Sequence, residues 1–152
     1  MPSRTFVLNE WFLHDLQGDN GNAAQRESAL LLERLIQNPD RITVLQGSPW
    51  MTKAYRLMKH HDPLVLELGK VLNQGLLRDS NNCVILGQHE LTPLPEELRQ
   101  IDLKEDAYLF ETYFAASADL IVTTDGRLIE KVAAIKSLNL ILRDEFLRDY
   151  LV

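Results

Sequence analysis

The chain has 152 residues, of which 45% are hydrophobic and 25% are charged, and its formal net charge is −6. This length and composition are typical of one globular domain, spanning residues 1–152, that buries its own core. Cys83 is the only cysteine, which excludes an internal disulfide and a zinc site built from cysteines. The acidic balance argues against broad coating of nucleic acid but leaves room for a local basic strip.

The amino-terminal residues and the lengths of the apolar runs argue against a signal peptide and a membrane-spanning helix. The first residues, MPSRTFVLNEWFLHD, lack the uncharged apolar core of a signal peptide. No apolar run approaches the ~20 residues that a membrane-spanning helix needs. We therefore expect a cytoplasmic protein with no membrane partner.

The first third of the chain predicts a strand followed by two helices. The apolar run at residues 5–9 is rich in strand formers. A short helix is expected over residues 10–16, and residues 18–22 give the strongest turn signal in the chain. An amphipathic helix over residues 23–37 ends before Pro39.

The middle of the chain predicts two more strands, at residues 42–46 and 83–87, with helices between them. Ser48 followed by proline is typical of a helix start. A further helical stretch runs from residue 63 to about residue 75, where we expect Gly75 to end it.

The last third predicts a loop at residues 88–100, and then a helix that opens at Asp102, because Glu105 completes a capping-box spacing. A continuous apolar run at residues 119–124 is typical of a fully buried strand. The remaining elements are a helix, a strand and a closing helix, at residues 127–136, 138–142 and 145–151. Alternation of strands and helices predicts a three-layer α/β/α sandwich with a central, mainly parallel sheet.

Ligands of open parallel sheets bind outside the carboxyl ends of the strands. The first predicted strand ends at Asn9 with Glu10 behind it, and the strand at residues 119–124 runs into Asp125. Asp106 lies in the first turn of the helix that precedes that strand. Asp125 also suits an N-cap, worth ~1 kcal/mol, and Asp106 suits a first-turn acid favoured by the helix dipole, so both interpretations stay open.

The stretch EDAYLFETYFAASADLIVTTDGRLI, residues 105–129, resembles the carboxy-terminal signature of the PIN-domain ribonucleases. In that signature an aspartate opens a helix, and the next strand ends in threonine, one variable residue and aspartate. The matching positions are Asp106, Ala118, Asp119, Thr123 and Asp125. The order of elements is similar over most of the chain, but the specific likeness covers residues 106–129.

The resemblance implies a ribonuclease that cleaves RNA with Mg²⁺ or Mn²⁺, with Asp106 and Asp125 as catalytic metal ligands and Asn9 or Glu10 assisting them. Such carboxylates hold a cation that activates water and stabilises charge on the phosphate. Many small proteins similar to this one are the toxin of a toxin–antitoxin pair. The implied partners are therefore RNA, an antitoxin protein and a second copy in a homodimer.

Two positions depart from the family pattern. Asn9 stands where an acid is usual, and Lys53 stands where a glutamate is usual. Glu10 replaces the missing acid only if the strand has ended by Asn9, because consecutive side chains of a strand point to opposite faces. Lys53 could instead occupy the place of a cation. The alternative function is therefore a catalytically degenerate RNA- or protein-binding module.

Lys53, Arg56 and His60 recur at helical spacing on one face. This face is either simply solvated or a strip that contacts RNA phosphates, for which Lys53 and Arg56 are the predicted RNA-binding residues. Asp15, near the turn signal, is interpreted as a turn or capping residue.

Overall fold

The computed structural model describes residues 3–152 and contains a five-stranded sheet. The strands are β1 (Thr5–Leu8), β2 (Arg41–Leu45), β3 (Cys83–Leu86), β4 (Leu120–Thr123) and β5 (Leu140–Leu142). The α-helices are α1 (Trp11–Gln17), α2 (Asn22–Gln37), α3 (Pro49–Leu57), α4 (Pro63–Lys70), α5 (Glu96–Arg99), α6 (Ala107–Ala115), α7 (Gly126–Val132) and α8 (Arg143–Tyr150).

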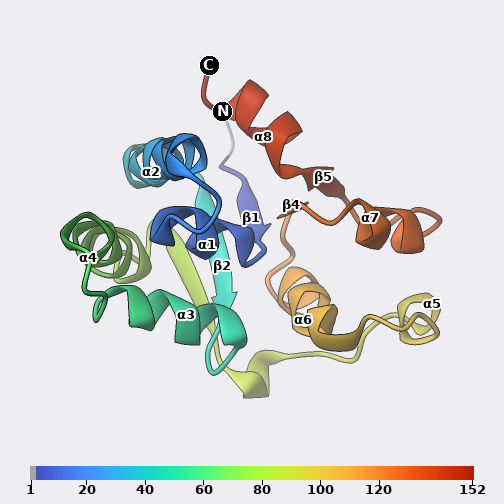
Figure 1. Ribbon diagram of the computed structural model, residues 1–152. Coiled ribbons are helices and arrows are strands. Elements are labelled where there is room, and N and C mark those ends of the chain that lie inside the picture. Colours follow the sequence, from blue (N-terminus) through green and yellow to red (C-terminus); the bar gives the residue numbers. More distant parts are fainter. Residues whose placement is uncertain (1–2) are drawn as a thin grey trace.

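The strands lie in the order β3-β2-β1-β4-β5, and every neighbouring pair is parallel. Figure 1 shows α2 and α4 on one side of the sheet and α6 on the other. The predicted three-layer α/β/α sandwich is confirmed. The strand order changes direction at β1, which puts the carboxyl ends of β1 and β4 at the switch point where ligands of such sheets bind.

Side-chain alternation along β1 divides the core into two layers. Phe6 and Leu8 pack with α1, α2 and α8 on one face, whereas Val7 packs with α6 and α7 on the other. All three side chains are buried. A strand buried on both faces reads as a continuous apolar run, as expected for a parallel sheet.

Gly75 does not end a helix, and that prediction is wrong. The chain continues from α4 into π-helical turns over Val71–Leu77, with Gly75 inside them. A Cβ on Gly75 would lie 3.2 Å from Cδ1 of Ile36 on α2, so the glycine allows close packing between helices. Within the same turns, the buried Asn73 amide donates to the carbonyls of Ala54 and Gly69 at 3.0 and 2.8 Å.

The helix predicted to open at Asp102 begins only at Ala107. Asp102 accepts a hydrogen bond from the Lys104 backbone N–H at 3.2 Å, and Lys104 has a φ of 51°. The left-handed backbone of Lys104 prevents an α-helix from starting at Asp102. Lys104 instead begins a 3₁₀ turn that ends at Asp106. Asp106 therefore lies immediately before α6 rather than inside its first turn.

The two tryptophans and the one cysteine of the chain are packed in the core. Trp11 and Trp50 are both buried, and Cys83 is a buried free thiol whose pKa is raised to about 12 by burial. Cys83 is therefore a poor nucleophile at neutral pH. Among the helices of residues 3–152, none combines the length and apolar character that a bilayer crossing requires.

Candidate active site

Three carboxylates belong to segments that adjoin the ends of β1 and β4 or the start of α6. Glu10 follows β1, Asp125 follows β4, and Asp106 precedes α6, which packs against both strands. We call Glu10, Asp106 and Asp125 the acid mouth. Because every strand is parallel, the residues after β1 and β4 emerge at the same edge of the sheet.

Glu10 meets the condition set for it in the sequence analysis, because the strand has ended before it. The strand β1 ends at Leu8, and Asn9 adds one more ladder bond, from its N–H to the Val122 carbonyl at 3.0 Å. Glu10 then adopts helical dihedrals, with φ −64° and ψ −12°. This turn of the backbone directs the Glu10 side chain toward α3 and α6 rather than into the sheet.

Both carboxylate oxygens of Glu10 are occupied by side chains. The ammonium of Lys53 on α3 pairs with Oε1, and the hydroxyl of Tyr108 on α6 donates to Oε2 at 2.9 Å. Burial, followed by the adjacent negative charge of Glu10, raises the pKa of the Tyr108 phenol. Tyr108 therefore stays protonated at neutral pH and serves as a hydrogen-bond donor.

Asn9 joins the ends of β1 and β4. Its side-chain Nδ2 donates to the Thr123 hydroxyl at 3.2 Å, and its Oδ1 accepts from the Glu10 backbone N–H at 2.7 Å. The same Thr123 hydroxyl oxygen accepts from the Asp125 backbone N–H at 3.1 Å. Asn9 thus holds the backbone of both acids in place, while its predicted catalytic role stays a prediction.

Asp125 caps α7, so the structural interpretation of this residue is confirmed. Its Oδ1 accepts from the backbone N–H groups of Arg127 and Leu128 at 3.0 and 3.2 Å. Its Oδ2 receives no hydrogen bond from any group in residues 3–152. Capping and metal binding are therefore compatible, because they use different oxygens of one carboxylate.

Asp106 lies in the negative potential of the other two acids. Its pKa is raised by burial first, then by the charges of Glu105, Asp125 and Glu10, with Lys131 acting in the opposite direction. No side-chain cap bond ties Asp106 to α6. A cation bound nearby would stabilise the ionised form of Asp106, because opposite charges favour the charged state of a carboxyl group.

The donor set suits one hydrated cation better than a pair. Within residues 3–152 there is no group of three or more His, Cys, Asp or Glu side chains close enough to bind a metal together. Glu10 is already paired, which leaves Asp106 and Asp125 with available oxygens. Mg²⁺ commonly binds through one or two carboxylates and retains several waters, and these two residues fit that arrangement.

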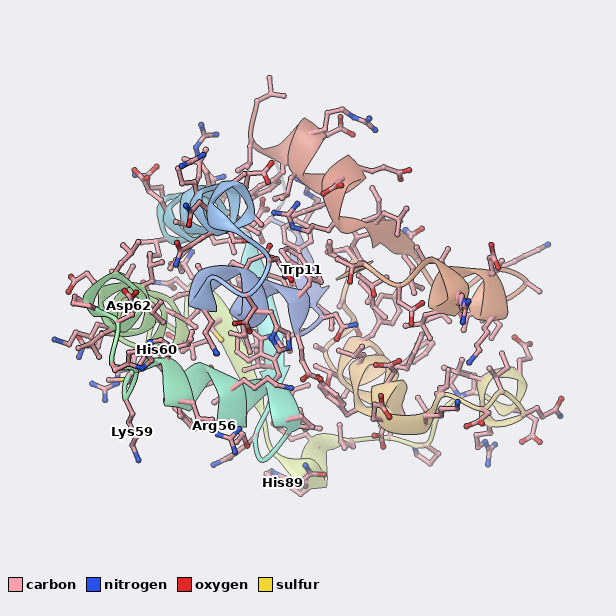
Figure 2. All side chains as sticks on the ribbon, viewed as in Figure 1. Trp11, Arg56, Lys59, His60, Asp62 and His89 are labelled. Carbon is pink, nitrogen blue, oxygen red and sulfur yellow. The ribbon has the colours of Figure 1, made fainter. Side chains whose placement is uncertain are left out.

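Lys53 and Arg56 have different surroundings although they lie one turn apart on α3. Lys53 turns into the acid mouth, whereas Arg56 is exposed and forms no ion pair within the described part of the chain. Figure 2 shows Arg56 and Lys59 extending from the outer side of α3 and the turn after it. Residues 47–61 include no acid, so this segment is locally basic on an acidic protein.

Asp15 is a buried ion-pair residue, and its interpretation as a turn or capping residue is wrong. The side chain is 2% exposed and accepts hydrogen bonds from Ser28 Oγ at 2.7 Å, Asn20 Nδ2 at 2.7 Å and Arg143 Nε at 2.8 Å. Sequence reasoning also missed Arg143. Sequence position gives a hint for each residue. Arg143 directly follows the last strand, which places it at the carboxyl edge of the sheet, and Asp15 lies one turn after Trp11 on the apolar face of its helix.

A surface hollow of about 430 Å³ is lined by Asn9, by Arg143 and by Glu10, which is one of the three residues of the acid mouth. Thr124, the neighbour of Asp125, also contributes to the lining. The hollow thus connects the carboxyl ends of β1, β4 and β5.

Comparison of the chain with family models, curated proteins and solved structures found no match. The PIN-domain resemblance therefore rests on the residues quoted from the sequence. Any activity must be argued from the chemistry of the site.

Proposed function

We propose that this protein is a metal-dependent ribonuclease in which Asp106 and Asp125 hold a single Mg²⁺ or Mn²⁺. The observation that carries the proposal is the position of these two carboxylates: Asp125 follows β4, and Asp106 immediately precedes α6, which packs against β1 and β4. The raised pKa of Asp106 is consistent with other acids nearby. The residues concerned come from separate segments, so their meeting depends on the fold.

The chemistry of the acid mouth supports a phosphodiester substrate. A divalent cation bound there would offset the repulsion among the carboxylates and would attract a phosphate oxygen. Asn9 and Thr123 fix the backbone of Glu10 and Asp125. Asp125 is also fixed by its capping bonds. Such preorganisation is what a site needs to hold a cation at a defined position.

Arg56 supports RNA as the polymer, because an exposed and unpaired guanidinium can contact the phosphate backbone. Lys53 cannot serve both as an RNA-binding residue and as the partner of Glu10 without giving up the ion pair. We therefore assign RNA contact to Arg56 and restraint of Glu10 to Lys53. An antitoxin partner, a homodimer and a toxin role stay predictions from the resemblance.

The second candidate function is an RNA-binding module that does not cleave. The ion pair between Lys53 and Glu10 favours it, because the ammonium already satisfies a carboxylate that a metal would otherwise contact. A fixed ammonium stabilises the acid mouth without a cation but cannot activate water as a metal ion does.

The two functions separate in a cleavage assay on a fluorescent single-stranded RNA with and without Mn²⁺. The ribonuclease proposal expects Mn²⁺-dependent cutting that Asp125→Asn abolishes. Asparagine keeps a side-chain oxygen for the α7 cap, so loss of activity would report the missing charge. Complete inactivity of the unaltered protein with Mn²⁺ would reject catalysis, and full activity of the variant would locate the site elsewhere.

Lys53→Gln tests whether the ammonium competes with the cation. Releasing Glu10 should raise Mn²⁺ affinity by about tenfold, which corresponds to ~1.4 kcal/mol. Lys59→Gln is the matched control, because it removes an equal charge from the outer surface next to the same helix. Calorimetric titration of Mn²⁺ measures both variants, and equal affinities would exclude competition by Lys53.

A further inference from the structure

We propose that Arg143 is a phosphate-binding residue for RNA, held ready in the hollow beside the acid mouth and covered by two exchangeable surface acids. Arg143 begins α8 directly after β5, at the same edge of the sheet as the acid mouth. Its side chain is 10% exposed, yet it lines the hollow that also contains Glu10 and Thr124.

One side of the Arg143 guanidinium is fixed by buried groups. Nε donates to Asp15 at 2.8 Å, and the guanidinium carbon lies 5.5 Å from the centre of the Trp11 ring. Asp15 is itself held by Ser28 and Asn20, and the Trp11 indole donates to the Val122 carbonyl at 2.8 Å. The guanidinium plane is therefore oriented before any ligand arrives, which lowers the entropic cost of binding.

The other side faces two carboxylates that can leave. Nη1 donates to Asp144 at 2.6 Å and Nη2 donates to Glu27 at 3.1 Å. These two acids are 88% and 51% exposed, whereas Asp15 is 2% exposed. Because both acids are exposed, their carboxylates regain contact with water when they leave the guanidinium, so a phosphate could replace them without disturbing the Asp15 pair.

The chemistry of the freed side suits a phosphodiester. Arginine carries five N–H donors, and only its Nε is bound to a buried acceptor here. The two Nη groups can donate in parallel to two phosphate oxygens, a geometry that planar guanidinium favours over a single point contact. RNA following the hollow would place one phosphate at Arg143 and a neighbouring segment at the acid mouth.

This inference adds a substrate contact to the proposed ribonuclease, but its test measures binding and does not require cleavage. The probe is a fluorescein-labelled single-stranded RNA, titrated in EDTA so that no metal-dependent cutting occurs. The double variant Glu27→Gln/Asp144→Gln removes both covering charges and should bind the RNA at least about fivefold more tightly than the unaltered protein. Neither substitution touches the buried pair.

A matched control distinguishes the uncovering of the Arg143 guanidinium from the effect of a less negative net charge on RNA affinity. Glu67→Gln/Glu96→Gln changes the net charge equally, and it also releases Arg99, which pairs with Glu96 at 2.7 Å on the surface. The proposal expects this control to gain less than twofold. It also expects Arg143→Gln, added to the Glu27/Asp144 variant, to abolish the gain and to lower the slope of log K against log salt by about 1.

Two results would overturn the role of Arg143. Equal gains in the two double variants would show that only net charge matters, and no gain in either would show that the guanidinium is a structural partner of Asp15 alone. Both variants keep Arg143 and Asp15, so the decision does not depend on whether Arg143→Gln folds. Absence of Mn²⁺-dependent cleavage together with the specific gain would reject the nuclease while supporting this site.

Discussion

Asp15 and Asp106 lie on opposite sides of the sheet and have opposite electrostatic surroundings. Asp15, on α1, is buried and accepts hydrogen bonds from Ser28, Asn20 and Arg143. Asp106, across the sheet beside α6, is half-buried, near Glu10 and Asp125, and its pKa is raised. Asp15 is paired with a buried guanidinium, whereas Asp106 lies among other negative charges.

The contrast teaches how to separate structural from functional acids in this protein. A buried charge persists only when partners compensate its loss of water, and Asp15 has such partners. A half-buried acid beside other acids lowers stability, and such groups often mark a functional site. Removing each charge in turn and measuring the free energy of unfolding tests this difference.

Asp15→Asn should produce the largest effect, because it leaves the Arg143 guanidinium without its buried counter-charge. Loss of one partner of a buried pair commonly costs about 3–5 kcal/mol in the free energy of unfolding. Urea denaturation at pH 7 measures it. Asp19→Asn, on an exposed acid that pairs with His14, is the control and should change the free energy of unfolding by less than about 1 kcal/mol. A comparable loss in both variants would contradict the structural role of Asp15.

Asp125 caps α7 and is also a proposed metal ligand, and two substitutions should isolate the contribution of the cap. Asp125→Ala removes the cap on the Arg127 and Leu128 N–H groups and should cost about 1 kcal/mol of unfolding free energy. Asp125→Asn should stay within a few tenths of a kcal/mol of the unaltered protein, since asparagine caps equally well. Thermal melts without metal measure both. If the alanine variant melts like the asparagine variant, the cap contributes nothing.

Much of the fold was predictable because local patterns determine it. The strand before Asn9 and the strand before Asp125 are continuous apolar runs, and alternation with helices implies a parallel sheet. The rule that ligands bind at the carboxyl edge then indicated where the acids would emerge. What failed was local detail that depends on packing: Gly75 allows α2 to approach, and the left-handed Lys104 delays the start of α6.

The partners within the site were beyond the reach of sequence patterns. Glu10 meets Lys53 and Tyr108, which are 43 and 98 positions away, and Asp15 meets Arg143 at a separation of 128. Spacing rules cover neighbours on one helix or strand, so they predict which residues share a face but not which distant element lies opposite. Lys53 illustrates this limit, because helical spacing placed it with Arg56, and only the family resemblance suggested that its ammonium could lie among the acids.

Asp106→Asn should give the smallest change, and in the opposite direction to the others. Because the pKa of Asp106 is raised in the folded state, that state binds the proton more tightly than the unfolded chain, so stability from this group is present at low pH. It is lost as the pH rises from the unfolded value of about 3.9 through the folded pKa. Above that window the ionised carboxylate destabilises the fold.

The asparagine variant cannot ionise, so at pH 7 without metal it should be more stable than the unaltered protein by less than about 1 kcal/mol after solvent screening. The difference should fade below about pH 4, as urea denaturation at a series of pH values would show. Glu67→Gln, which removes an exposed acid on α4, is the matched control for the loss of one negative charge. Mn²⁺ should reverse the order at pH 7, because a bound ligand stabilises only the protein that retains the Asp106 charge. A variant less stable than the unaltered protein in the absence of metal would mean that the Asp106 carboxylate is a satisfied structural group like Asp15.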